Sequence, residues 1–512
     1  MSSELGTSSS DSSTPGTEEP SDEGASSSAV TRHVDAPRGR WGVLRHAHYR
    51  NMLGAQFVSN IGGWMEMFGM QQLVAEKTGS LKALGYLGAA QLIPILLFGM
   101  LGGLVADRVN RKTLLITTQT LLMLVAGAVA ALSATNFASP PALLGAWENV
   151  GHALNIHEAS HIVVPLLILS WLNGTVLAFN MPAWQVLTPR LVPKNELTQA
   201  ITLNGVQFNL SRVIGPATSG VVYAAFGPTP LFIVNSLSFL GVVMTATTTP
   251  DAPAPKRHAQ HPWHDVMDAV RFIVHSPGPR AVFMAMTIMS FLAAPLIRVL
   301  PLFVIDVYQA PPARAEKISS WLLALQGIGA VAGGLSLRLI PSWYPRHHFI
   351  PMAIMAAGLS ISLFAGTTAM IPGFVAMLVC GFFWIWAFNQ SWAAMQTLVN
   401  DHIRWRVMAL ANVFAFGATA VGSVILGVIG DGLKEPHGPL SAGRATQWSI
   451  LSLSIPLFIA GIAMLSFRTP EVDGMPRVLP DGRKPTRNFI KAILASEYRP
   501  KATAESDAAG RL

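Results

Sequence analysis

Apolar residues along this chain come in blocks of about 20, the length that an α-helix needs to cross the core of a bilayer. Polar residues and most of the charges gather in the segments between the blocks. Twelve blocks lie near 50–74, 83–105, 113–133, 162–182, 198–225, 229–248, 281–308, 318–340, 348–368, 371–396, 407–430 and 447–467. The pattern predicts an all-α polytopic membrane protein with 12 transmembrane helices.

Composition supports this interpretation. Charged residues make up 12% of the 512 residues and hydrophobic residues 51%, whereas a soluble globular chain is about 25% charged. So few charges cannot cover the surface of a soluble protein of this length. The single cysteine, Cys380, excludes a disulfide within the chain and a cysteine metal cluster, and we expect no cofactor.

The distribution of charge predicts the orientation in the membrane. Most of the 35 Lys and Arg residues fall in alternate connections, the asymmetry that marks cytoplasmic loops. We therefore expect both termini in the cytoplasm, in a multi-pass protein of the inner (plasma) membrane. The net charge of +8 is then an orientation signal, so the expected partner is the lipid bilayer rather than nucleic acid. We find no oligomerisation signal and expect a monomer.

The blocks divide the chain into two halves. A shift of 207 residues aligns Leu191, Leu203, Gly215 and Gly220 with Leu398, Leu410, Gly422 and Gly427, which indicates a duplicated six-helix unit. The predicted parts are a disordered cytoplasmic N-terminal arm (1–46), a six-helix bundle (47–248), a cytoplasmic linker with a surface helix (249–280), a second six-helix bundle (281–467) and a cytoplasmic tail (468–512).

The segment "GGLVADRVNRK", residues 102–112, joins the second and third blocks. The paired glycines are expected to end a helix and to let it approach a neighbour closely, and the basic residues suit the inner membrane surface. An anchor of this kind has no need of Asp107. The acid therefore indicates a further role, for example beside the positive N-terminal end of a helix.

This segment resembles the conserved cytoplasmic loop of the major facilitator superfamily, G-x-x-x-D-R-x-x-R-K. The matching residues are Gly103, Asp107, Arg108, Arg111 and Lys112. Asn110 occupies a position where the family often has glycine. The stretches "GAQFVSNIGGWM", "AFNMPAWQVLTPRLVPKNELTQAITLNG", "SRVIGPATSG" and "RWRVMALANVFAFGATAVGSVILG" are similar to the branch that contains enterobactin exporters and macrolide efflux pumps.

The resemblance implies a rocker-switch transporter with two bundles around one central cavity. In that family the aspartate of the loop helps to hold the cytoplasmic side shut, and Arg404 and Arg406 are placed to meet Asp107. The pair Gly215-Pro216 resembles an element of efflux members. Pro216 should bend its helix and Gly220 should permit close packing, which favours export.

Ionisable residues inside membrane spans are costly and are functional candidates. Glu66 and Arg212 lie at similar depths in their blocks. They either pair to carry protons, with Arg212 setting the pKa of Glu66, or form a static ion pair between helices. Arg298 and Asp306 are interpreted as a pair at the outer membrane interface. Candidate cavity residues are Asn60, Trp64, Asn180, Asn204, Gln207, Gln326 and Asn389.

A competing motif is "HEASH" at residues 157–161, which matches the zinc-hydrolase pattern H-E-x-x-H. A third ligand is not evident, because His152 lies upstream of the motif rather than downstream. We therefore expect no metal site and no enzyme.

The sequence thus predicts a proton-driven exporter of an amphipathic small molecule of drug or siderophore type. The alternatives are a membrane-embedded zinc hydrolase and a non-transporting sensor on the same fold. Bound zinc would favour the hydrolase, and a sealed or charge-free cavity would favour the sensor.

Overall fold

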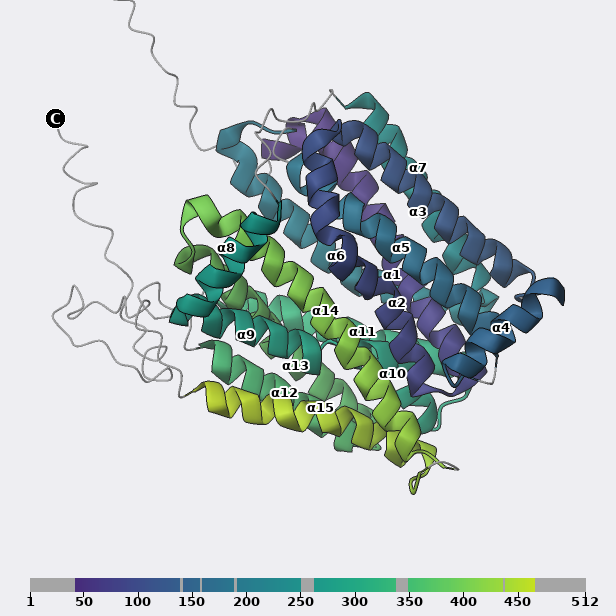
Figure 1. Ribbon diagram of the computed structural model, residues 1–512. Helices are drawn as coiled ribbons and strands as arrows, with labels where there is room; N and C mark the ends of the chain where they lie inside the picture. The colour runs from purple at the N-terminus through teal and green to yellow at the C-terminus, as the bar shows by residue number, and fades with distance from the viewer. Residues whose placement is uncertain are drawn as a thin grey trace, which may run out of the picture. The chain divides into compact units, whose positions relative to one another are not determined.

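The chain divides into two units, Met1–Gly42 and Val43–Leu512. The computed structural model describes residues 42–138, 141–156, 159–187, 191–249, 262–337, 349–435 and 438–465. These residues form helices (Figure 1), apart from short connections and an isolated bridge between Lys434 and Leu440. The predicted all-α class is confirmed.

The first half of the chain contains α1 (Ala47–Thr78), α2 (Leu81–Arg108), α3 (Arg111–Ala134), α4 (Pro141–Ala153), α5 (Ser160–Leu187), α6 (Leu197–Phe226) and α7 (Thr229–Thr248). The second half contains α8 (Pro262–His275), α9 (Pro277–Leu292), α10 (Leu296–Asp306), α11 (Pro312–Ser336), α12 (Phe349–Gly366), α13 (Met370–Leu398), α14 (Asp401–Leu433) and α15 (Ala442–Met464). The halves meet mainly where α2 packs on α14 and α6 packs on α11.

Ten helical segments are long and apolar enough to cross a membrane. The helices α1 and α6, with 32 and 30 residues, are long enough but fall outside these ten. Their sequences are less apolar because they include residues such as Glu66, Gln207 and Arg212. Both helices lie within the bundle, since α1 packs on α6 and α7, and α6 packs on α1 and α11. Their polar side chains can therefore face protein rather than lipid.

The span predicted over 281–308 is not one continuous helix. It consists of α9 and α10, separated by a turn at residues 293–295. Pro295 explains the break, because proline has no N–H for the helix ladder and disfavours helical backbone in the residue before it. Interrupted membrane helices often lie beside transported substrates, so the start of α10 is a candidate region for binding.

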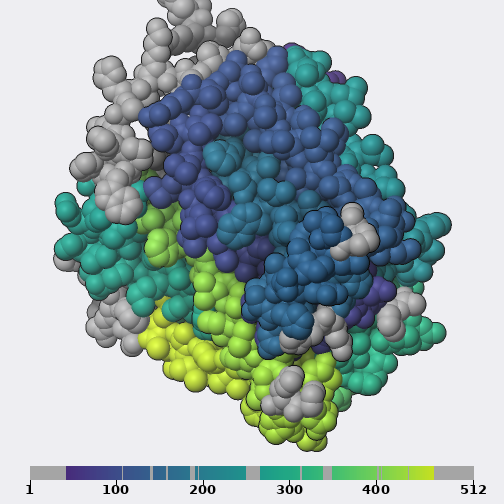
Figure 2. All heavy atoms as spheres, turned by 45° about the vertical axis from the view of Figure 1, so that its right-hand side comes forward, coloured from purple at the N-terminus to yellow at the C-terminus, as the bar shows by residue number. Residues whose placement is uncertain are grey.

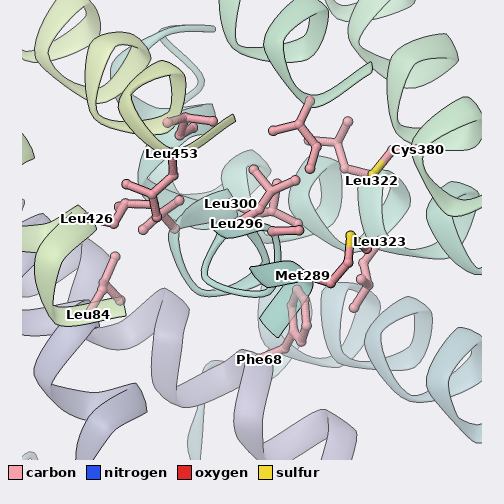
Figure 3. Close-up of a cluster of buried hydrophobic side chains, with 14 of the residues drawn as sticks. Phe68, Leu84, Met289, Leu296, Leu300, Leu322, Leu323, Cys380, Leu426 and Leu453 are labelled. Carbon is pink, nitrogen blue, oxygen red and sulfur yellow. The ribbon is translucent and has the colours of Figure 1, made fainter. Parts of the chain in front are cut away.

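A large hydrophobic core connects the two halves around α10. Figure 3 shows Leu296 and Leu300 of α10 among Phe68 and Leu84 from the first half and residues of the second half such as Leu322. All five side chains are nearly inaccessible to solvent. Burial of this apolar surface holds the halves together at this level of the bundle.

The predicted surface helix is present as α8, which packs on α9 and α14. Ile273 of its apolar face is buried, and Val266 and Val270 are half-buried. The side chain of Trp263 lies outside what the structure describes. The 134–161 connection, predicted as a loop, contains the helix α4, which packs on α5.

Candidate transport cavity

A cavity of about 1200 Å³ lies between the two halves and is lined by residues of both. Its walls are formed by α1, α2, α3, α5, α6 and α7 of the first half and by α8, α10 and α14 of the second. Figure 2 shows the yellow-green atoms of α14 alongside the blue and purple atoms of the first half. Ligand pockets usually occupy about 300–1000 Å³, so the volume suffices for a large organic molecule.

The two ends of the bundle differ. We call the end that carries Arg108, Lys112, Arg404 and Arg406 the basic end, and the end that carries Ser80 and Asp431 the opposite end. The cavity reaches the basic end, where exposed Arg108 and half-buried Arg406 line it. The cavity stops short of the opposite end.

At the opposite end, Asp431 at the end of α14 caps the start of α2. Its carboxylate accepts hydrogen bonds from Ser80 Oγ (2.5 Å), Leu81 N (2.8 Å) and Lys82 N (3.2 Å). Lys434 Nζ donates to Gly79 O at 2.8 Å. A carboxylate at the positive N-terminal end of a helix is stabilising, so these contacts hold the halves together.

Glycines bring the same two helices into close contact. A Cβ on Gly85 of α2 would lie 2.4 Å from Ser423 O, and a Cβ on Gly427 of α14 would lie 2.5 Å from Leu81 O. These distances are too short for any side chain, so the backbones touch only because both residues are glycine. With the Asp431 contacts, this packing closes the opposite end.

Three of the seven predicted cavity residues line the cavity: Asn60, Trp64 and Asn180. Asn180 Nδ2 also donates to Thr118 Oγ1 at 2.8 Å. The other four residues are absent from the lining. Their helices lie in the bundle as expected, but these residues are on other faces.

Two of these four residues form hydrogen bonds to neighbouring helices, and the other two are described by their burial. Asn204 Oδ1 accepts a hydrogen bond from Tyr49 OH at 3.3 Å, and Gln326 Oε1 accepts one from Arg212 Nη2 at 3.2 Å. Gln207 is buried away from the cavity, and Asn389 is exposed.

Several lining residues are not among the sequence candidates. They are Gln56, Gln91, Gln119, Asn235 and Arg298. Each lies within a predicted span, so its polarity was a usable signal, but nothing in the sequence shows which way it faces. The amide oxygen of Gln119 has no hydrogen-bond partner among the described residues. It can accept a hydrogen bond from a bound molecule or from water.

Glu66 lines the cavity and is 6% exposed. Its Oε2 accepts a hydrogen bond from Asn235 Nδ2 of α7. Arg212 donates instead to Gln326, and its guanidinium carbon lies 6.0 Å from the centre of the Trp64 ring. The expected pairing of Glu66 with Arg212 is therefore not seen among the described contacts, because the two side chains face different neighbouring helices.

Arg298 is also placed differently from the expectation. It lines the cavity in the first turn of α10 and is 9% exposed. Asp306, eight residues later, accepts a hydrogen bond from Thr446 Oγ1 at 2.8 Å. The predicted interface pair of Arg298 and Asp306 is therefore not formed in the described part of the chain, since each residue has a separate partner.

The loop between α2 and α3 is held by its own polar residues. Asn110 caps α3 by accepting a hydrogen bond from Lys112 N at 2.9 Å. The buried Arg111 donates from Nε to Ala106 O at 3.3 Å. Lys112 Nζ donates to Thr249 O at 2.8 Å, which ties the loop to the end of α7.

The paired glycines do not end a helix, contrary to the expectation, because α2 continues to Arg108. A Cβ on Gly102 would lie 2.1 Å from Ala178 O, so Gly102 allows α2 to contact α5. Gly103 has no such neighbour and lines the cavity. The close approach therefore depends on Gly102 rather than on the motif residue Gly103.

The predicted partner of the loop is the start of α14. Arg404 Nε donates to Val399 O at 3.2 Å, and Arg406 Nη1 lies 3.4 Å from Asp268 Oδ2 of α8. The side chain of Asp107 lies outside what the structure describes, and so does its predicted contact with these arginines.

The predicted helix-bend residues lie in α6, which runs through Pro216 without interruption. A Cβ on Gly215 would lie 2.5 Å from Trp64 Cβ, and a Cβ on Gly220 would lie 2.7 Å from Ser320 Oγ. Both glycines thus permit close packing, Gly215 on α1 and Gly220 on α11. Beside Gly220, Ser219 Oγ donates to the buried Glu316 Oε1 at 2.6 Å.

The zinc-hydrolase motif cannot be followed in space, because His157 and Glu158 lie outside the described residues. Across the part of the chain that is described, no three His, Cys, Asp or Glu side chains come together as metal ligands.

Two helical halves around a large polar and aromatic cavity have the architecture of a membrane transporter for small molecules. The fold is similar to that of the nucleoside transporter NupG (TM-score 0.61, 13% identity, 82% of this chain and 100% of the other). It is also similar to a D-xylose–proton symporter (TM-score 0.60, 15% identity, 84% and 98%).

The sequence defines the family more closely. The sequence model of the transmembrane secretion effector family matches residues 38–163 and 153–480, and the chain belongs to this family of major facilitator transporters. It is a multi-pass membrane protein, and its family consists of transporters rather than enzymes.

Curated relatives are about one-fifth identical to this chain. Macrolide efflux protein A of Streptococcus pyogenes is 22% identical, with 72% of this chain and 86% of the relative covered. An enterobactin exporter of Escherichia coli is 22% identical (62% and 74%), and a staphyloferrin A transporter of Staphylococcus aureus is 21% identical (74% and 88%). The predicted resemblance to exporters of drugs and siderophores is confirmed.

Proposed function

We propose that this chain exports an amphipathic small molecule of drug or siderophore type by alternating access, with protons as the coupling ion. The observation that carries the proposal is the cavity of about 1200 Å³, which reaches the basic end while Asp431 and the glycines close the opposite end. Such a cavity can receive a substrate from one side at a time. A sensor on the same fold would not need so large a space.

In this proposal the membrane is crossed 12 times: by the ten apolar segments and by α1 and α6. The halves 47–248 and 281–467 rock against each other, and the segment 249–280 connects them. The basic end and both termini face the cytoplasm, as the excess of Lys and Arg predicts. The described conformation then takes up substrate from the cytoplasm. The protein works as a monomer, because one chain encloses the whole cavity.

Glu66 is the proposed proton carrier. Among the described residues that line the cavity, it is the one with a carboxyl group, and no described cation pairs with it. A buried carboxyl group of this kind can bind and release a proton without breaking an ion pair. Arg212, placed against Trp64 and Gln326, contributes to the packing between α6 and α11.

The loop motif is proposed to close the basic end in the other conformation. Asp107 would then approach the start of α14, near Arg404 and Arg406. In the described conformation Arg406 lies beside Asp268, so closure would exchange one acidic partner for another. Gly103, Arg108, Arg111 and Lys112 would complete this gate.

Transport driven by protons can be tested in inverted membrane vesicles that contain the full chain and a pH-sensitive acridine dye. A macrolide, enterobactin and staphyloferrin A are added in turn, and at least one of them should release protons from vesicles acidified by respiration. Glu66→Gln should abolish this release, because the amide cannot bind a transferable proton. The matched control is Glu148→Gln on α4, where the side chain is exposed and outside the cavity. Undiminished release in a normally inserted Glu66→Gln protein would refute the role of Glu66.

A further inference from the structure

Arg298 holds a buried positive charge at the deep end of the cavity. It lies in the first turn of α10, just after the break in this membrane span. The N-terminal end of a helix carries a partial positive charge, which adds to that of the guanidinium. Both the guanidinium charge and the partial charge at the helix end favour binding of an anion at this position.

The described partners of Arg298 are neutral amides. Nη2 donates to Gln91 Oε1 of α2 at 3.1 Å. With the Gln71 amide oriented so that its nitrogen donates to Ile297 O at 3.1 Å, its oxygen accepts from Arg298 Nη1 at 3.2 Å. None of the described carboxylates forms an ion pair with Arg298. A buried arginine is normally paired with an acid. Because Arg298 has no such partner among the described residues, its charge is available to a ligand.

The rest of the cavity has the same electrostatic character. Arg108 and Arg406 line it toward the basic end, whereas Glu66 is the one acidic side chain in the described lining. Trp64 and Phe208 supply an aromatic wall, with ring centres 6.2 Å apart. The surface is thus suited to an aromatic or apolar body with an acidic group.

We propose that the cavity binds an amphipathic organic anion whose acidic group contacts Arg298. This inference rests on the proposed function and specifies its substrate class. A carboxylate or sulfonate would accept two parallel hydrogen bonds from the guanidinium, and the apolar part of the molecule would lie toward Trp64 and Phe208. Arginines at the entrance would attract the anion.

Anion binding would also act on the contact between the halves. Arg298 belongs to the second half, whereas Gln71 and Gln91 belong to the first. The Arg298 side chain also lies against Gly88 of α2, where a Cβ would be 3.4 Å from Nε. An anion that draws the guanidinium away from Gln91 removes a hydrogen bond across the interface. Substrate binding would therefore favour separation of the halves at the opposite end.

The test compares two xanthene dyes of similar size and opposite charge, fluorescein (anion) and rhodamine 123 (cation). Their binding to the purified full chain in detergent is measured by fluorescence anisotropy, with protein-free micelles as the blank. Fluorescein should bind at least about tenfold more tightly than rhodamine 123, and Arg298→Gln should remove about tenfold of this affinity. Arg298→Lys should retain part of it, because the charge remains but the two-pronged contact is lost.

Gln91→Glu provides a second test that keeps Arg298. It places a carboxylate of nearly the same shape beside the guanidinium, so fluorescein affinity should fall about as much as in Arg298→Gln. Arg280→Gln is the matched control, because Arg280 is exposed and outside the cavity. The thermal unfolding midpoint of each variant verifies that it is folded.

Two results would overturn the proposal. One is equal or tighter binding of rhodamine 123; the other is unchanged fluorescein binding in folded Arg298→Gln and Gln91→Glu proteins. Binding is measured without a proton gradient, so either result would leave the test of Glu66 in vesicles unaffected. Conversely, an intact Glu66→Gln exporter would refute proton coupling but not anion binding.

Discussion

The Glu66 carboxyl group depends on α7 for its polar contact. Asn235 Nδ2 donates to it, and Ser238 Oγ lies 3.5 Å from Asn235 Oδ1, on the other side of the same amide. Gly62, one turn before Glu66, allows the helices to approach this closely, since a Cβ there would lie 2.8 Å from Asn235 Oδ1. The amide is thus held with its donor toward the carboxyl group.

Replacement of Asn235 by leucine should therefore destabilise the protein through Glu66. The loss of the donor should lower the free energy of unfolding by about 1–2 kcal/mol, and by less when Glu66→Gln is already present. A double-mutant cycle measured by unfolding in detergent tests this coupling. Asn389→Leu, at an exposed site, should change the free energy by no more than about 0.5 kcal/mol. Strictly additive effects of Asn235→Leu and Glu66→Gln would contradict the expectation.

At this scale the sequence predicts the depth of a residue in the membrane but not its direction. Counting along the apolar blocks places Asn180 and Gln326 inside the bundle. Only Asn180 faces the cavity, because direction depends on how each helix is rotated against its neighbours. For the same reason the sequence predicts Arg298 at the membrane interface rather than in the cavity, since the break before α10 and the orientation of Gln91 are tertiary features.

The helix pair α2–α14 is the element that closes the opposite end. Its cap consists of one carboxylate and three donors around the first turn of α2. Ser80 before an apolar block is a recognisable helix start. The sequence does not indicate that a residue about 350 positions later, Asp431, completes the cap. Each of the twelve predicted apolar blocks overlaps helix in the described residues, but the block at 281–308 is divided between α9 and α10, and α1 and α6 are not among the ten most apolar segments.

Asp431→Asn should loosen the opposite end, because the amide keeps the size of the side chain but loses its negative charge. A weakening of about 1–2 kcal/mol corresponds to a shift of about five- to thirtyfold toward the separated state. The reporter is Ser423→Cys, at a position buried against Gly85, in a chain with Cys380 replaced by alanine. The rate at which this introduced cysteine reacts with a maleimide should rise by the same factor, about five- to thirtyfold.

Glu148→Gln is the control for this experiment. It also replaces a carboxylate by an amide, at an exposed site on α4 outside the cavity, and should not expose Ser423→Cys. Equal labelling rates with and without Asp431→Asn would show that glycine packing alone keeps the end closed.

At the scale of the whole molecule, the two halves use equivalent glycines. Gly215 of α6 packs on α1 at Trp64, and Gly422 of α14 packs on α9 at Phe291. Gly220 packs on α11 of the other half, and Gly427 packs on α2 of the other half. The shift of 207 residues pairs Gly215 with Gly422 and Gly220 with Gly427. The duplicated unit predicted from these alignments therefore has a counterpart in the contacts.

Exchange of an internal anion for an external proton would move charge across the membrane. Outward movement of the anion and inward movement of the proton are both electrically equivalent to moving positive charge inward. An inside-negative potential favours each transferred charge by about 2.3 kcal/mol per 100 mV. We therefore expect fluorescein export from right-side-out vesicles to slow when valinomycin and potassium abolish the potential at a constant pH gradient. Glu148→Gln vesicles should respond like the wild type. A rate independent of potential would show that the cycle moves no net charge.

The cap on α2 has a consequence for how the protein is made. Ser80 and Asp431 are 351 residues apart in the chain, and synthesis at 5–20 residues per second separates them by roughly 20 to 70 seconds. During that time the first half is already in the membrane. The start of α2 then has the cap from Ser80, whose Oγ accepts a hydrogen bond from Ala83 N at 3.0 Å, but it lacks the Asp431 carboxylate. The first half therefore reaches its final packing at this end only when the ribosome has nearly finished the second.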